Sequence, residues 1–248
     1  MDAAEPKPAS RRIVWLALLF GVPAIAVLLA LGTWQVQRLH WKDALVATIS
    51  ERIAAAPLRL AAIEEKAAEG AAVDYWPVTA KGRFLHAGER HFLATHQGKS
   101  GFFVYTPLLL GDGRAVLVNR GFVPYDLKDP GKRTAGQVEG EVEISGLARD
   151  RLAEKPSSLV PDNDPAKNIF YWKDLDAMAA SAGLPAGADV LPFFIDANEA
   201  PHPGGWPAGG VTIIDLPNNH LQYAVTWYGL AAALAGVMLV GWLKRVRR

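Results

Sequence analysis

The hydrophobic positions of the chain concentrate near its two ends. One uncharged run extends over residues 13–34, and a second extends over residues 221–243. A helix rises about 1.5 Å per residue, so either run is long enough to cross the ~30 Å hydrocarbon core of a bilayer. Pro217 precedes the second run, and Asn218 or Asn219 can cap the helix that follows. The pattern therefore predicts a transmembrane helix near each end.

The first run has a competing interpretation as a cleaved signal peptide, because Ala24-Ile25-Ala26 has the small-x-small form of a cleavage site. The apolar stretch continues beyond this point, past the ~7–15-residue core of a signal peptide, which favours an uncleaved anchor. Basic residues flank both runs on the terminal side, at Lys7, Arg11, Arg12, Lys244, Arg245, Arg247 and Arg248. These charges predict cytoplasmic termini, although Arg38 and Lys42 weigh mildly against that orientation.

Between the two runs the pattern changes to shorter segments. The first helix is expected to continue to residue 56, because glycine and proline are missing from residue 35 until Pro57. Further helices are expected over residues 60–72 and 168–182, and an irregular loop over residues 203–207. Segments rich in β-forming residues predict strands at 78–85, 90–96, 101–110, 114–123, 138–149, 191–196 and 211–216. Hairpin loops are expected at 87–88, 97–100 and 111–113.

These elements predict a membrane protein in which two transmembrane helices flank one extracytoplasmic α+β domain. The domain is expected to be rich in antiparallel strands that form a sheet or a partly closed barrel. The expected division is a cytoplasmic tail (1–12), a transmembrane helix (13–34), the outer domain (35–219), a second transmembrane helix (220–243) and a basic tail (244–248).

Composition narrows the possible functions. The 248 residues carry a formal net charge of +1 and show no basic face or RNA-binding motif, so no nucleic-acid partner is expected. There are no cysteines, which excludes disulfides, thiolate metal sites and covalent haem attachment. Gly-x-Ser-x-Gly, Walker and Gly-x-Gly-x-x-Gly patterns are missing. No hydrolytic or dehydrogenase signature therefore stands out in the sequence.

His220 is the strongest candidate for chemistry, because it lies at the outer boundary of the second predicted span. Tyr223 and Trp227 follow at i+3 and i+7, on the same helix face. A neutral imidazole can be the axial ligand of a haem iron. It can also cap the helix, hydrogen-bond a neighbour or lie among lipid headgroups, and the residues alone favour such a structural role. The two aromatic rings can pack on a macrocycle or on another helix.

Other polar residues allow more than one interpretation. Arg38 shares a helix face with Trp34 and Trp41, where it can bind lipid phosphate or a carboxylate-bearing ligand. Arg120 is expected to hold a turn through a bidentate hydrogen bond, or to present its guanidinium to a partner carboxylate. The histidines at 86, 91 and 96 lack a carboxylate cluster at suitable spacing, which disfavours a metal site.

Five segments in order resemble a known family. Residues 218–227 (NNHLQYAVTW) are similar to the second-helix signature of the Surfeit-locus-protein-one family, the membrane factors that assist assembly of haem–copper oxidases. Four earlier segments match in kind and order: 31–42 (LGTWQVQRLHWK), 118–124 (VNRGFVP), 170–175 (FYWKDL) and 203–207 (PGGWP). Any one of them is weak, but five between two correctly placed spans identify the chain as a bacterial member.

The resemblance implies a function and a site. The family histidine that corresponds to His220 is the residue to which haem a binding by bacterial members is attributed. The chain is then expected to bind haem a non-covalently in the bacterial inner membrane, with its main domain periplasmic. The implied partners are the catalytic subunit of cytochrome c oxidase, the enzyme of haem a synthesis and membrane lipids. Two alternatives remain: a haem-free docking factor that stabilises an oxidase assembly intermediate, and, ranked last, a membrane-anchored sensor.

Overall fold

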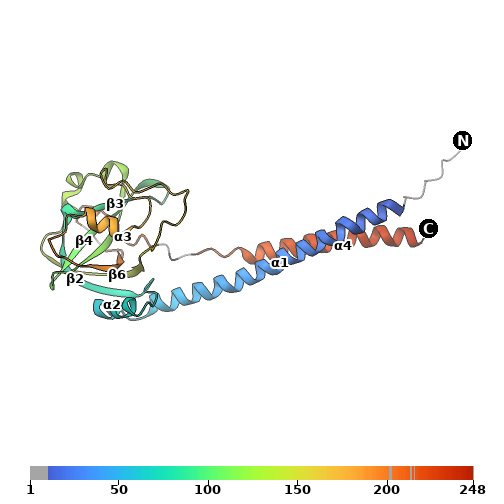
Figure 1. Ribbon diagram of the computed structural model, residues 1–248, viewed down its shortest axis with the longest axis horizontal. Coiled ribbons are helices and arrows are strands. Elements are labelled where there is room, and N and C mark those ends of the chain that lie inside the picture. Colours follow the sequence, from blue (N-terminus) through green and yellow to red (C-terminus); the bar gives the residue numbers. More distant parts are fainter. Residues whose placement is uncertain (1–10, 201–202, 213, 215, 248) are drawn as a thin grey trace. The chain divides into compact units, whose positions relative to one another are not determined.

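The computed structural model describes residues 11–200, 203–212, 214 and 216–247. The chain forms two compact units: Met1–Thr48 together with Asp215–Arg248, and Ile49–Ile214. The first unit contains two long helices and the second contains the strands (Figure 1).

The two long helices are α1 (Arg11–Ala54) and α4 (His220–Val246). Both are long and apolar enough to cross a membrane, over Trp15–Ala54 and His220–Lys244, which confirms the expected pair of terminal apolar helices. As predicted, α1 continues past Trp34, and it ends at Ala54. Its 44 residues measure about 66 Å at 1.5 Å per residue. This is about twice the hydrocarbon thickness, so only part of α1 is needed to span a bilayer.

Small and hydroxyl side chains allow α1 and α4 to approach closely. A Cβ atom on Gly32 would lie 2.7 Å from a ring carbon of Tyr228, so only glycine fits at this position. Thr33 Oγ1 and the Tyr228 hydroxyl form a hydrogen bond of 3.0 Å. Gly21 adjoins the flexible end of the Met238 side chain. The helices therefore pack side by side along the first unit (Figure 1).

The second unit is a seven-stranded sheet with two short helices. Its strands are β1 (Leu58–Arg59), β2 (Pro77–Phe84), β3 (Arg90–His96), β4 (Lys99–Leu110), β5 (Ala115–Pro124), β6 (Glu141–Asp150) and β7 (Val190–Ala197). The α-helices are α2 (Leu60–Ala68) and α3 (Leu175–Ser181). Four 3-10 turns complete the described elements: η1 (His86–Gly88), η2 (Tyr125–Leu127), η3 (Pro130–Gly136) and η4 (Pro203–Gly205).

The sheet closes on itself to form a small barrel. Its strand order is β1-β2-β6-β7-β5-β4-β3, and β2 also pairs with β4, so β2, β6, β7, β5 and β4 form a ring. All ring pairings are antiparallel except that of β5 with β7. Gly82 on β2 faces the carbonyl of Leu109, where a Cβ atom would clash. The glycine thus permits the contact that closes the ring.

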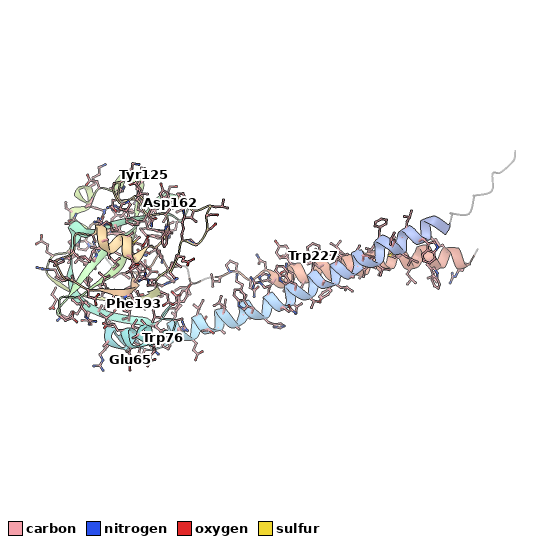
Figure 2. All side chains as sticks on the ribbon, viewed as in Figure 1. Glu65, Trp76, Tyr125, Asp162, Phe193 and Trp227 are labelled. Carbon is pink, nitrogen blue, oxygen red and sulfur yellow. The ribbon has the colours of Figure 1, made fainter. Side chains whose placement is uncertain are left out.

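Alternating side chains divide the buried apolar residues among three clusters, the smallest of which contains Phe102, Val104 and Val123. Each ring strand contributes to one cluster, which therefore fills the barrel interior, and Phe193 belongs to it (Figure 2). Its neighbour Phe194 belongs to the second cluster, outside the ring, with Phe170 and Met178. α3 covers this outer cluster, while Ile63 of α2 packs on the interior one. The two-residue period of a strand explains why adjacent phenylalanines enter different clusters.

Three predictions about the second unit were wrong. The loop at residues 87–88 does not make a hairpin, because β3 pairs with β4 and β2 pairs with β6 and β4. The predicted helix over 168–182 forms only at Leu175–Ser181, since Phe170 bridges to Phe92 and Asp174 caps the helix start. The described positions of the segment 211–216 lie outside any strand, while residues 213 and 215 lie outside the described residues.

Candidate functional site

His220 is the first residue of α4, and Asn218 fixes this helix start within the first unit. The side-chain oxygen of Asn218 accepts a hydrogen bond from the backbone N–H of His220 at 3.4 Å. Its amide nitrogen donates to the Asp43 carboxylate on α1 at 2.8 Å. Asn218 therefore caps α4 and joins it to α1 at the level of the histidine.

The imidazole of His220 is held by Gln35 of α1. His220 Nδ1 lies 2.7 Å from Gln35 Oε1, and the glutamine side chain is buried between the helices. An amide oxygen only accepts hydrogen bonds, so Nδ1 carries the proton in this pair. The other ring nitrogen, Nε2, then keeps its lone pair. This arrangement is typical of metal-ligating histidines, whose second nitrogen is oriented by a hydrogen bond.

The two aromatic residues that follow His220 face different surroundings. Trp227 is half-buried. His220, Ala224, Trp227 and Ala231 follow one another at helical spacings of three or four residues, so they form one stripe along α4, and both alanines are buried. This stripe faces α1, because His220 bonds Gln35 of that helix and the two alanines are buried; Trp227 is labelled in Figure 2. Tyr223 is 55% exposed. Trp227 is therefore placed for contact between helices, whereas Tyr223 presents its ring outward.

Arg38 lies one turn beyond Gln35 on α1. Its guanidinium stacks on the ring of Trp41 at 4.5 Å from the ring centroid, as expected for an exposed arginine beside an aromatic ring. Trp34, on the same helix, is also half-exposed. Among the hydrogen bonds and ion pairs described for the first unit, none joins Arg38 to His220. The two residues thus belong to one helix pair without a direct bond.

The three histidines of the second unit have separate environments. His86 Nε2 bonds the carbonyl of Val138 at 2.8 Å, His91 Nε2 bonds the carboxylate of Glu89 at 2.7 Å, and His96 packs against Phe103 and Phe122. No group of three or more metal-ligating side chains occurs among the described residues. His202, between two prolines, lies outside the described residues.

A buried charged network adjoins Arg120. Arg133 pairs with Glu89, which also bonds His91, and all three are buried. Burial alone would raise the pKa of Glu89, but the hydrogen bonds from His91 and Arg133 lower it below the ordinary carboxyl value. Arg120 itself donates to the carbonyl of Gly136 and lies 3.4 Å from His86 Nδ1. It bonds the last residue of η3, as expected for a structural arginine, but the expected bidentate bond is not seen among the described residues.

Sequence reasoning did not identify Gln35, Glu89 or Arg133. Gln35 lies inside the quoted segment 31–42, three residues after the buried Gly32 and on the same face of α1, and this spacing was the available signal. Glu89 and Arg133 are 44 residues apart, so no local pattern connects them. Their pairing depends on the position of η3 beside the start of β3.

Comparison with known proteins gives one consistent result. The model of the SURF1 family matches residues 22–232. Surfeit locus protein 1 of Homo sapiens is 39% identical over 94% of this chain and 77% of its own length. The Rattus norvegicus protein of the same name is 41% identical over 87% and 71%, and a SURF1-like protein of Monosiga brevicollis is 38% identical over 86% and 82%. The chain belongs to the SURF1 family.

Proposed function

We propose that this protein is a membrane-anchored assembly factor for haem–copper cytochrome c oxidase, and that it binds haem a non-covalently and aids its delivery to the catalytic subunit. Family membership supports the assembly role. The observation that carries the haem site is the 2.7 Å bond between His220 Nδ1 and Gln35 Oε1, which leaves Nε2 available for iron. The protein makes and breaks no covalent bond in this role.

The residues around His220 fit a haem. The donor nitrogen is oriented by Gln35, and the exposed ring of Tyr223 adds apolar surface beside it. Because the chain has no cysteine, attachment must be non-covalent. When bound, haem a supplies a redox-active iron whose properties depend on its axial ligand. The exposed guanidinium of Arg38, one turn from Gln35, is the cation proposed to face a propionate.

The proposed topology follows from charge and helix length. α1 and α4 span the inner membrane of a bacterium, with both termini cytoplasmic and the barrel unit periplasmic. α1 becomes charged at Arg38, Lys42 and Asp43, which supports an exit from the bilayer near Trp34. His220 then lies at the outer surface, where the oxidase subunit and the enzyme of haem a synthesis are the proposed partners.

A haem-free docking factor is the second candidate function. The bonds of His220 to Gln35 and of Asn218 to Asp43 join α4 to α1, so the histidine also has a structural explanation. Trp227 lies on the stripe of α4 that faces α1, which favours a structural role for this residue as well. In this case the barrel unit and the helices hold an assembly intermediate of the oxidase.

The test is a visible spectrum of the protein made in cells that synthesise haem a and purified in mild detergent. The proposal expects a haem a band that disappears in His220→Ala. In Gln35→Leu we expect a band that persists with affinity reduced by about 10–100-fold, because the ligand nitrogen loses its orienting partner. A folded protein without any band supports the docking factor. A band unchanged in His220→Ala means that another residue holds the iron.

A further inference from the structure

We infer that the open mouth of the barrel binds a small apolar molecule with a single carboxylate, which the guanidinium of Arg120 recognises. A cavity of about 430 Å³ lies at the end of the ring where β2 and β7 finish and β6 begins. This volume is within the ~300–1,000 Å³ range of small-molecule sites, which often lie in barrel mouths. The inference concerns the second unit alone and does not depend on haem binding.

Among the described residues that line this cavity, Arg120 is the one cation. It follows Val116 and Val118 at two-residue steps on β5, so its side chain is directed into the barrel interior. The side chain is 1% exposed, and its Nε has no hydrogen-bond partner among the described residues. The guanidinium also stacks on Phe84, at 4.8 Å from the ring centroid. An unpaired donor of a buried cation is costly, and an anion would satisfy it.

The neighbouring charges leave Arg120 without compensation. No carboxylate lies within ion-pair distance of its guanidinium in the described part of the chain. The nearby buried carboxylate, Glu89, is already neutralised by Arg133. Two buried arginines therefore share one buried carboxylate. Burial lowers the pKa of Arg120 to about 10; the charge of Glu89 opposes this shift, and the charge of Arg133 adds to it.

The remaining walls define the ligand class. Val138, Val142, Ile144 and Ala197 line the cavity with Phe84, so the body of the ligand must be apolar. Glu143 and Glu199 also line it, and both are exposed. Two carboxylates at the opening repel a second negative charge on the ligand. A monocarboxylate satisfies these conditions, because a planar guanidinium can bond both of its oxygens, whereas phosphate and dicarboxylates carry too much charge.

The proposal is tested by isothermal titration of the full chain in mild detergent with hexanoate, phenylacetate and, as a neutral control, phenylacetamide. We expect at least one acid to bind and the amide not to bind. Arg120→Lys should weaken binding at least tenfold, because lysine cannot make the paired hydrogen bonds. Ala197→Leu should abolish binding by filling the cavity while leaving Arg120 in place.

Four results would overturn the proposal. Neither acid binds at millimolar concentration, or phenylacetamide binds as tightly as phenylacetate, which indicates partition into apolar surface. Inorganic phosphate binds more tightly than either acid, which contradicts the monocarboxylate class. Finally, binding is unchanged in Ala197→Leu, which places the ligand elsewhere. This last variant retains Arg120, so it decides the question even if Arg120→Lys fails to fold.

Discussion

The buried ion pair between Arg133 and Glu89 allows a quantitative test of the second unit. Arg133, in η3, donates to both carboxylate oxygens of Glu89, and one of these bonds measures 3.1 Å. Both side chains are 2% exposed. Arg133 also donates to the carbonyl of Leu127 at 2.9 Å. Because neither charge reaches water, removing one partner deprives the other of its main compensating charge.

Arg133→Met keeps an unbranched side chain but leaves the Glu89 carboxylate with His91 as its remaining side-chain partner. Removal of one member of a buried pair costs about 3–5 kcal/mol. This is a large fraction of the ~5–15 kcal/mol that stabilises a typical domain. Glu89→Gln combined with Arg133→Met removes both charges. The double variant should therefore regain about 2 kcal/mol of the loss seen in the single variant.

The assay is urea unfolding of the full chain in mild detergent, followed by tryptophan fluorescence. Trp76, Trp172 and Trp206 belong to the second unit, and Trp76 is labelled in Figure 2. The free energies of unfolding are compared between variants whose dependence on urea concentration has the same slope. Two results would refute the reasoning. Either Arg133→Met loses less than about 1 kcal/mol, or the double variant is no more stable than Arg133→Met.

Two further predictions concern His86 and Gly121. Burial lowers the pKa of His86 below its ordinary value of 6.5, against an opposing bond to the Val138 carbonyl. On acidification His86 is therefore protonated at a higher pH in the unfolded chain than in the folded chain. This favours the unfolded state, so the free energy of unfolding falls as the pH drops from about 7 toward 5. Urea titrations at several pH values should show this slope, and His86→Gln should reduce it; an equal slope in the variant contradicts the assignment. Gly121 has φ +125°, and a Cβ atom would clash with the carbonyl of Ala208. Gly121→Ala is expected to cost about 3 kcal/mol through strain and overpacking. A thermal midpoint within about 2 °C of the parent protein would contradict this.

Local pattern was enough to locate most strands, because alternation and turn residues act over a few positions. The hairpin between β3 and β4 is an example. Gln97 and Gly98 have φ of 49° and 76°, the positive values that a two-residue hairpin turn requires. The partners of β2 could not be predicted from local pattern. β2 pairs with β6 about sixty residues later and with the end of β4, and such pairings depend on barrel closure rather than on a local turn.

In the candidate site, too, some features follow from local sequence and others from contacts between distant residues. The order of the five segments in the sequence led to the family, and the boundary position of His220 made it the candidate ligand. No local pattern shows which ring nitrogen is free, because the partner Gln35 lies 185 residues earlier in the chain. Trp227 could be assigned to helix packing only when its exposure was known.

The sequence by itself determined the two apolar helices, the strand-rich segment between them and the family resemblance. These depend on composition, short periodicities and residue order, all of which are properties of neighbouring positions. The tertiary structure alone decided the closure of the barrel, the Glu89–Arg133 pair and the uncompensated Arg120 at the barrel mouth. Each of these depends on side chains that are distant in sequence, and burial gives their charges an energetic weight that water would otherwise screen.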